Sequence, residues 1–169
     1  MNDLIGDYTS FFTDVLGRLK EKGIEIKGYK LSHLGVRASS FEEYERIREG
    51  IKKLSKSFAE NEHNGRPISK LLLKGPLNLP EGFEVNLIEL MPPKPSHPYP
   101  PGIEHLGVVI GENLEAFAQE HRDVITGRQD QSPICKPYFI TFENEKRVKF
   151  YDISLQEVVE REGTEFIAI

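Results

Sequence analysis

The tetrapeptide His-Leu-Gly-Val occurs twice in this chain, first within residues 30–38 ("KLSHLGVRA") and again within residues 102–110 ("GIEHLGVVI"). Its two histidines, His33 and His105, are 105 − 33 = 72 residues apart. A chain of this length repeats some tetrapeptide by chance with a probability of about a fifth. The repeat therefore indicates a duplicated structural unit only if the flanking segments repeat as well.

The segments that follow the two copies have the same order of predicted elements. After the first copy, apolar residues at helical spacing in 39–58 precede strands in 68–90, with a further short extended piece near 64–68. After the second copy, a helix in 113–125 precedes two strands in 137–154. Each copy thus predicts a strand, a helix and then two or three strands, which indicates a duplication.

The chain is long enough for one domain, or for two small modules that share a core. The stretch "MPPKPSHPYPPG" holds six of the eleven prolines and can be neither a helix nor an interior strand. We therefore expect a single domain with an N-terminal helix (1–28), a first module (29–90), a proline-rich connection (91–102), a second module (103–154), and a C-terminal helix and tail (155–169).

Composition indicates in which cellular compartment the protein works and which kinds of partner it binds. The formal net charge of −5, with no basic stripe interleaved with aromatic residues, argues against nucleic acid. No apolar run approaches the roughly 20 residues of a membrane span, and the first residues do not resemble a secretory signal. The single cysteine, Cys135, favours a reducing cytoplasm. We expect a cytoplasmic protein that binds a small-molecule substrate, either as a monomer or as a homodimer.

Strand alternation predicts where the repeated histidines point, because alternate side chains share one face. His33 points with Gly35 and Arg37. In the second copy, His105 points with Gly107, while the apolar residues between them face the helices. Since glycine in a strand often marks a close approach by a backbone or a ligand, both histidines are expected beside such sites.

A carboxylate joins the two histidines in this prediction. Glu89 lies among apolar neighbours in the last strand of the first module, where an unpaired charge would be costly. Alignment of the last strands of the two modules places Tyr151 at the position of Glu89. Two imidazoles and one carboxylate suit Fe(II), and Zn, Mn, Ni or Co can also occupy such a set. Three protein ligands would leave positions open for water or substrate.

The motifs "SHLGVR", "NGRPI", "LIELMPPKPSHPYPPGIEHLGVVI" and "VKFYDISLQEVV" together resemble the YecM-like proteins of the vicinal oxygen chelate superfamily, over nearly the whole chain. The resemblance implies an α+β fold in which two βαβββ modules, related by pseudo-twofold symmetry, form a cupped mixed sheet around a divalent metal. It also implies that His33, Glu89 and His105 are the metal ligands. The fourth position, usually Glu or His in the superfamily, is Tyr151 here.

Each of these residues also has a simpler interpretation. The histidines would then be hydrogen-bonded strand residues, and Glu89 would pair with a basic residue. Tyr151 is either a hydrogen-bond donor or a fourth ligand, and a phenol with a pKa near 10 favours the donor. The candidates for recognising an anionic substrate are Arg37, Arg66 and Lys149. Arg66 could equally fix its turn.

Other candidate residues are weaker. His63, His97 and His121 lie in polar surroundings, where solvent exposure is the expected state. Cys135 has no histidine near it in the sequence to activate it as a nucleophile.

Three functions remain open at this level. The first is a metal-dependent isomerase, lyase or dioxygenase on a small oxygen-bearing substrate, with Glu89 and Tyr151 as catalytic groups and Zn, Fe, Mn or Ni as the metal. The second is a non-catalytic domain that binds a metal or a metabolite. The third is a structural or interaction domain with a degenerate site, for which Tyr151 is the main argument.

Overall fold

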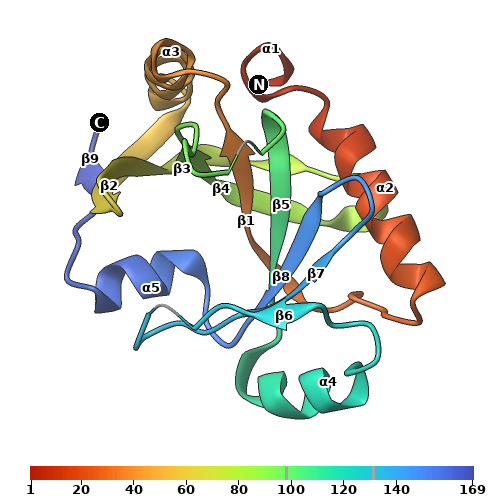
Figure 1. Cartoon of the computed structure of the whole chain (residues 1–169). Coiled ribbons are helices and arrows are strands. Elements are labelled where there is room, and N and C mark those ends of the chain that lie inside the picture. The colour runs from red at the N-terminus through yellow and green to blue at the C-terminus, as the bar shows by residue number, and fades with distance from the viewer. Residues whose placement is uncertain (98, 131) are drawn as a thin grey trace.

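The computed structural model describes residues 1–97, 99–130 and 132–169, which form one mixed sheet with helices packed against it (Figure 1). The strands are β1 (Lys30–Arg37), β2 (Ser55–His63), β3 (Arg66–Asn78), β4 (Glu84–Met91), β5 (Gly102–Val109), β6 (Gly127–Arg128), β7 (Tyr138–Thr141), β8 (Arg147–Tyr151) and β9 (Ile167–Ala168). The α-helices are α1 (Asn2–Ile5), α2 (Tyr8–Glu21), α3 (Phe41–Lys52), α4 (Leu114–Glu120) and α5 (Leu155–Arg161), with 3-10 turns η1 (Pro80–Gly82) and η2 (Gly111–Asn113).

The sheet consists of two modules joined at their first strands. Its strand order is β6-β7-β8-β5-β1-β4-β3-β2-β9. In the first module β1 pairs in parallel with β4, and in the second module β5 pairs in parallel with β8. The antiparallel pair of β1 and β5 joins the two halves. This arrangement confirms the predicted α+β fold with two βαβββ modules.

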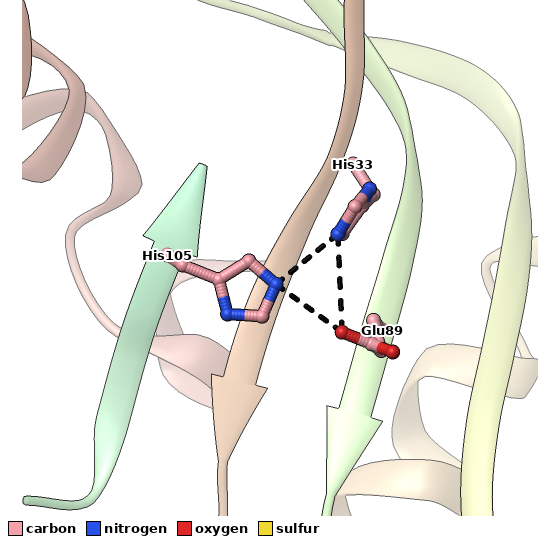
Figure 2. A group of neighbouring side chains, drawn as sticks. All are labelled: His33, Glu89 and His105. Carbon is pink, nitrogen blue, oxygen red and sulfur yellow. Dashed lines mark hydrogen bonds and ion pairs between the residues drawn. The ribbon is translucent and has the colours of Figure 1, made fainter. Parts of the chain in front are cut away.

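The first strand of each module lies at the centre of the sheet and is covered on both faces. Six consecutive residues of β1 and six of β5 are buried, a pattern typical of strands without a solvated face. On the outer face, Leu34, Val36, Leu106 and Val108 join a core that includes residues of α2, α3 and α4. His33 and His105 lie on the other face, where both point toward Glu89 (Figure 2). The core therefore fixes the backbone that carries both histidines.

The predicted helix in residues 39–58 was wrong for residues 53–58. The helix begins after Ser40, whose side chain accepts a hydrogen bond from the Glu43 amide, and it ends at Lys52. Residues 55–63 form β2 instead, because pairing with β3 outweighs the helical spacing of Leu54 and Phe58. Asn64, with φ of 52°, and Gly65, with φ of 73°, make the two-residue turn between these strands.

The short strands β6 and β9 were also absent from the sequence prediction. Each has two residues and depends on pairing with a distant segment, β6 with β7 and β9 with β2. Of the predicted proline-rich connection, Pro98 lies outside the described residues, and the described remainder runs from β4 to β5. Among the described residues, no helix is both long enough and apolar enough to cross a membrane.

Candidate metal centre

Three side chains from three adjacent strands converge on one point of the cupped face. His33 comes from β1, Glu89 from β4 and His105 from β5 (Figure 2). The two Nε2 atoms are 3.1 Å apart. Oε2 of Glu89 lies 3.2 Å from Nε2 of His105 and 3.8 Å from Nε2 of His33. The structure thus brings together the three residues predicted as metal ligands.

Two glycines make room for the imidazole rings. On the paired strands β1 and β5, Gly35 lies opposite His105, and Gly107 lies opposite His33. A Cβ atom added at Gly35 would be 2.1 Å from Cε1 of His105, and one at Gly107 would be 2.6 Å from Cε1 of His33. Each histidine ring therefore packs over the glycine of the other copy. This reciprocal packing explains why the repeated motif contains both residue types.

The spacing of the three donor atoms fits one small divalent ion. Two atoms each about 2.1 Å from an ion, at angles between 90° and 110°, are about 3.0–3.4 Å apart. The separations of 3.1 Å and 3.2 Å lie in this range, and the separation of 3.8 Å is still bridgeable by one ion. The three donors lie within 4.8 Å of one another. The residues present therefore fit a divalent ion bound by two imidazoles and one carboxylate.

An extra residue in a β-bulge precedes each histidine, and the side chain of that residue contacts Nδ1 of the histidine ring. Ser32 is the extra residue between the pairs Leu31–Val108 and His33–Gly107, and Glu104 is the extra residue near the other end of the same ladder. Bulges re-aim side chains. As a result, Oγ of Ser32 lies 2.9 Å from Nδ1 of His33, and Oε1 of Glu104 lies 3.4 Å from Nδ1 of His105.

These contacts favour the tautomer of each histidine in which Nε2 is free to bind a metal. When Nδ1 of a histidine carries the proton and donates it, Nε2 keeps its lone pair for an ion. Oγ of Ser32 is itself held in place, because it accepts a hydrogen bond of 2.7 Å from the amide of Leu155 at the start of α5. Oε2 of Glu104 accepts a hydrogen bond of 2.8 Å from Nε of Arg37 and forms an ion pair of 2.7 Å with its NH2 atom.

Protonation states at the site also suit a metal. Complete burial lowers the pKa of His33 to about 3, despite the opposing attraction of Glu89. Burial raises the pKa of the Glu89 carboxyl, but the hydrogen bond with His105 and the charges of His33, His105 and Lys149 together outweigh it, so this pKa lies well below 4.5. At neutral pH His33 is therefore neutral and Glu89 is ionised, as metal ligands must be.

Strand register corrects the alignment of Tyr151 with Glu89. Glu89 pairs with Gly35 on β1, whereas the residue that pairs with Gly107 on β5 is Lys149. Lys149 therefore occupies the position that corresponds to Glu89, and Tyr151 lies two residues further along β8. The alignment from sequence was wrong because it matched the two strands by composition, without knowledge of their partners.

Tyr151 nevertheless belongs to the same cluster. Its ring centroid lies 5.4 Å from that of His33. Burial, together with the negative charge of Glu89, raises the pKa of the Tyr151 hydroxyl well above 10. A neutral phenol can donate a hydrogen bond but is a poor metal ligand.

The three donor groups lie at the base of a cavity of about 610 Å³ between the two modules and α5. Glu89 and Tyr151 line this cavity, whereas both histidine rings are fully buried beneath it. Seven basic and four acidic residues line it, although the whole chain has a net charge of −5. The cavity is thus a locally positive region of an acidic protein.

The predicted substrate-binding residues all line this cavity, but they differ in their contacts. Arg37 is engaged by Glu104, by the carbonyl oxygen of Pro92 and by the sulfur of Met91. Nζ of Lys149 lies 3.4 Å from Oε1 of Gln129.

Arg66, the third of them, has its NH1 atom buried without a hydrogen-bond partner among the described residues. Arg147, which had not been singled out, lines the cavity with a buried and unpartnered Nε. Strand alternation places Arg147 on the same face of β8 as Lys149, and this pattern could have identified it as a cavity residue.

Of the weaker candidates, two of the three histidines are exposed as expected. His63 and His97 are exposed, and His121 is half-buried against Phe117. Cys135 lines the cavity, but burial raises the pKa of its thiol to about 12, which leaves it protonated. Glu104 was missed, because strand alternation gave no reason to expect the residue before His105 to reach the ring of its neighbour.

Two βαβββ modules in one sheet, with histidines on the paired first strands, form the architecture that the sequence resemblance implied, with a candidate metal centre at its middle. A family model described as "YecM protein" matches residues 1–162. The chain therefore belongs to the YecM family.

Comparison with solved structures supports the fold. A structure described as "Structural Genomics, Protein EC4020" is 23% identical, with a TM-score of 0.74 over 91% of this chain and 88% of that one. A hypothetical protein BH1468 from Bacillus halodurans C-125 is 16% identical, with a TM-score of 0.50 over 74% of this chain and 94% of that one.

A third structure, the fosfomycin resistance protein FosX from Mesorhizobium loti, is 16% identical over 81% of this chain and 100% of that one. Its TM-score of 0.30 is too low to transfer any property. Among the curated proteins, none matches this sequence.

Proposed function

We propose that this protein is a divalent-metal-dependent enzyme that acts on a small, oxygen-bearing and anionic substrate, with His33, Glu89 and His105 as the metal ligands. The observation that carries the proposal is the convergence of their three donor atoms at the base of a positively charged cavity of about 610 Å³. This volume lies within the range of small-molecule sites. The reducing environment favoured by a single cysteine, Cys135, agrees with a cytoplasmic enzyme.

A divalent ion held there (Zn, Fe, Mn or Ni) would supply Lewis acidity toward oxygens of the substrate. The side chains around it have separate tasks. Glu89 is the one ligand of the three that lines the cavity, so its carboxylate can also take up a proton from a bound substrate. The neutral Tyr151 hydroxyl donates a hydrogen bond to a substrate oxygen, and Lys149 provides a positive charge beside it. These groups suit isomerase, lyase or dioxygenase chemistry.

The proposal is tested first by metal content. The protein is purified without chelators and without a histidine-rich tag, and metals are quantified by elemental analysis. We expect about one divalent ion per chain, lost when His33→Ala and His105→Ala are combined, because too few ligands then remain. A matched control combines His63→Ala with His97→Ala, which removes two exposed histidines and should leave the metal content unchanged.

Turnover is tested on the same proteins. Metal-loaded protein is incubated with a panel of small oxyacids and epoxides, and products are followed by proton NMR against the double histidine variant. Conversion that requires the metal supports the enzyme. Metal binding with no conversion across the panel would favour the non-catalytic binding domain, and undiminished metal in the double variant would contradict the site itself.

A further inference from the structure

Two arginines that line the cavity each have a buried nitrogen atom without a partner among the described residues. Neither the NH1 atom of Arg66 nor Nε of Arg147 has a hydrogen-bond partner among the described residues, although both atoms are buried. A buried donor left unpaired costs stability, and each such group in a folded protein requires an explanation. Neither side chain forms an ion pair within the described part of the chain.

Other arginines in the same cavity are already paired. Arg37 is held by Glu104, with distances of 2.8 Å and 2.7 Å. Arg128 is held by Glu115 at 2.6 Å. Arg37 and Arg128 each have a carboxylate partner, which is the arrangement expected of arginines with a structural role. Arg66 and Arg147 lack such a carboxylate within the described residues, and they line the cavity itself.

Strands β3 and β8 run in the same direction, so their first residues lie at the same end of the sheet. Arg66 is the first residue of β3 and Arg147 the first residue of β8, and the parallel pairing of β5 with β8 places Arg147 next to His105. In the sheet β4, β1 and β5 lie between β3 and β8, so the two arginines reach the cavity from opposite sides of the strands that carry the histidines and Glu89. The Arg147 guanidinium also lies 5.2 Å from the ring centroid of Tyr99, in the range of a cation–π contact that limits its movement.

We propose that Arg66 and Arg147 form an oxyanion subsite, so that the substrate carries a carboxylate, phosphate or phosphonate group in addition to the oxygens that meet the metal. The inference rests on the proposed metal-dependent function and deepens it. Guanidinium groups bind such anions through paired, charge-assisted hydrogen bonds. The surroundings of Arg66 agree with the assignment, because burial and then repulsion from the nearby Arg37 lower the pKa of Arg66. A bound anion relieves this repulsion and satisfies the unpaired donors.

Calorimetric titration of the full-length, chelator-treated protein tests the subsite separately from the metal. Inorganic phosphate and acetate are titrated in separate arms at constant ionic strength, into the wild type, Arg66→Gln and Arg147→Gln. Arg128→Gln is the matched control, since it removes a cavity arginine that Glu115 already engages. We expect one anion per chain, bound about tenfold more weakly or worse in each subsite variant and equally well in the control.

The two arms also identify the group that is bound. Tighter binding of phosphate assigns a tetrahedral oxyanion, and tighter binding of acetate assigns a carboxylate. No binding of either anion, unchanged binding in both subsite variants, or an equal loss in Arg128→Gln would overturn the subsite.

Thermal unfolding of the same variants separates a binding role from a structural one. Removal of an unpaired buried charge should leave the unfolding temperature of Arg66→Gln and Arg147→Gln equal to or above that of the wild type, whereas a marked fall would indicate structural arginines and contradict the proposal. Metal content is measured in parallel. If wild-type protein purified without chelators contains no divalent metal and takes none up, while the chelator-treated protein binds the anion as expected, the proposed function is refuted and the subsite stands.

Discussion

The reciprocal packing of histidine over glycine makes a sharp prediction for Gly35→Ala. The added Cβ would lie 2.1 Å from Cε1 of His105, whereas ordinary contacts begin near 3.4 Å. The ring must therefore retreat by about 3.4 − 2.1 = 1.3 Å. Metal sites tolerate deviations of about 0.2 Å in ligand distance. A displacement of this size removes His105 from the ligand set.

The expected loss of affinity follows from this displacement. Changes to outer-shell partners of a metal site cost about 10–100-fold in affinity, so the loss of one ligand from three should cost at least about 100-fold. Overpacking of this kind lowers the free energy of unfolding by about 1–3 kcal/mol, which leaves the protein folded if it has ordinary stability.

Competition with a chromophoric chelator measures the zinc affinity of Gly35→Ala, and circular dichroism verifies its fold. Gly75→Ala is the control, because Gly75 also lies in a strand and an added Cβ there meets nothing within 4 Å. A folded Gly35→Ala that binds zinc as tightly as the wild type would refute the packing argument.

Three further predictions concern the Tyr151 hydroxyl, the pH dependence of stability and the turn at Gly65. Tyr151→Phe should retain the metal and lose about 0.5–1.5 kcal/mol of binding energy toward a substrate or product, measured by calorimetry; loss of the metal would instead identify Tyr151 as a ligand. Because the pKa of His33 falls from 6.5 unfolded to about 3 folded, the unfolded chain takes up a proton that the folded chain excludes. The free energy of unfolding of the metal-free protein should therefore fall as the pH drops below about 6.5, and urea unfolding should show a weaker fall in His33→Asn; equal slopes would exclude the buried neutral imidazole. Gly65→Ala should lose about 1 kcal/mol of stability in a urea titration, because φ at Gly65 is 73°, and an unchanged midpoint would contradict the strained turn.

The order of elements in the two modules and the three candidate donor residues were predictable from local sequence features, whereas the cupped arrangement was implied only by the family resemblance. The repeated tetrapeptide marks the same strand in both modules, and strand alternation places His33 and His105 on one face. Glu89 stands out as a charge among apolar neighbours. These features need no knowledge of which strand pairs with which.

Features that depend on pairing were not predictable from the sequence. Strand β2 continues the helical spacing of apolar residues that begins in α3, and only its ladder with β3 decides its state. The bulges at Ser32 and Glu104 exist only in the register of β1 with β5. The correspondence of Lys149 with Glu89 likewise appears only when both parallel pairs are known.

The central claim is that His33, Glu89 and His105 bind one ion, and anomalous diffraction from crystals of the metal-loaded protein tests it most directly. We expect a single strong anomalous peak per chain, about 2.0–2.3 Å from Nε2 of both histidines and from a carboxylate oxygen of Glu89. A peak elsewhere, or no peak at this position under saturating metal, would contradict it.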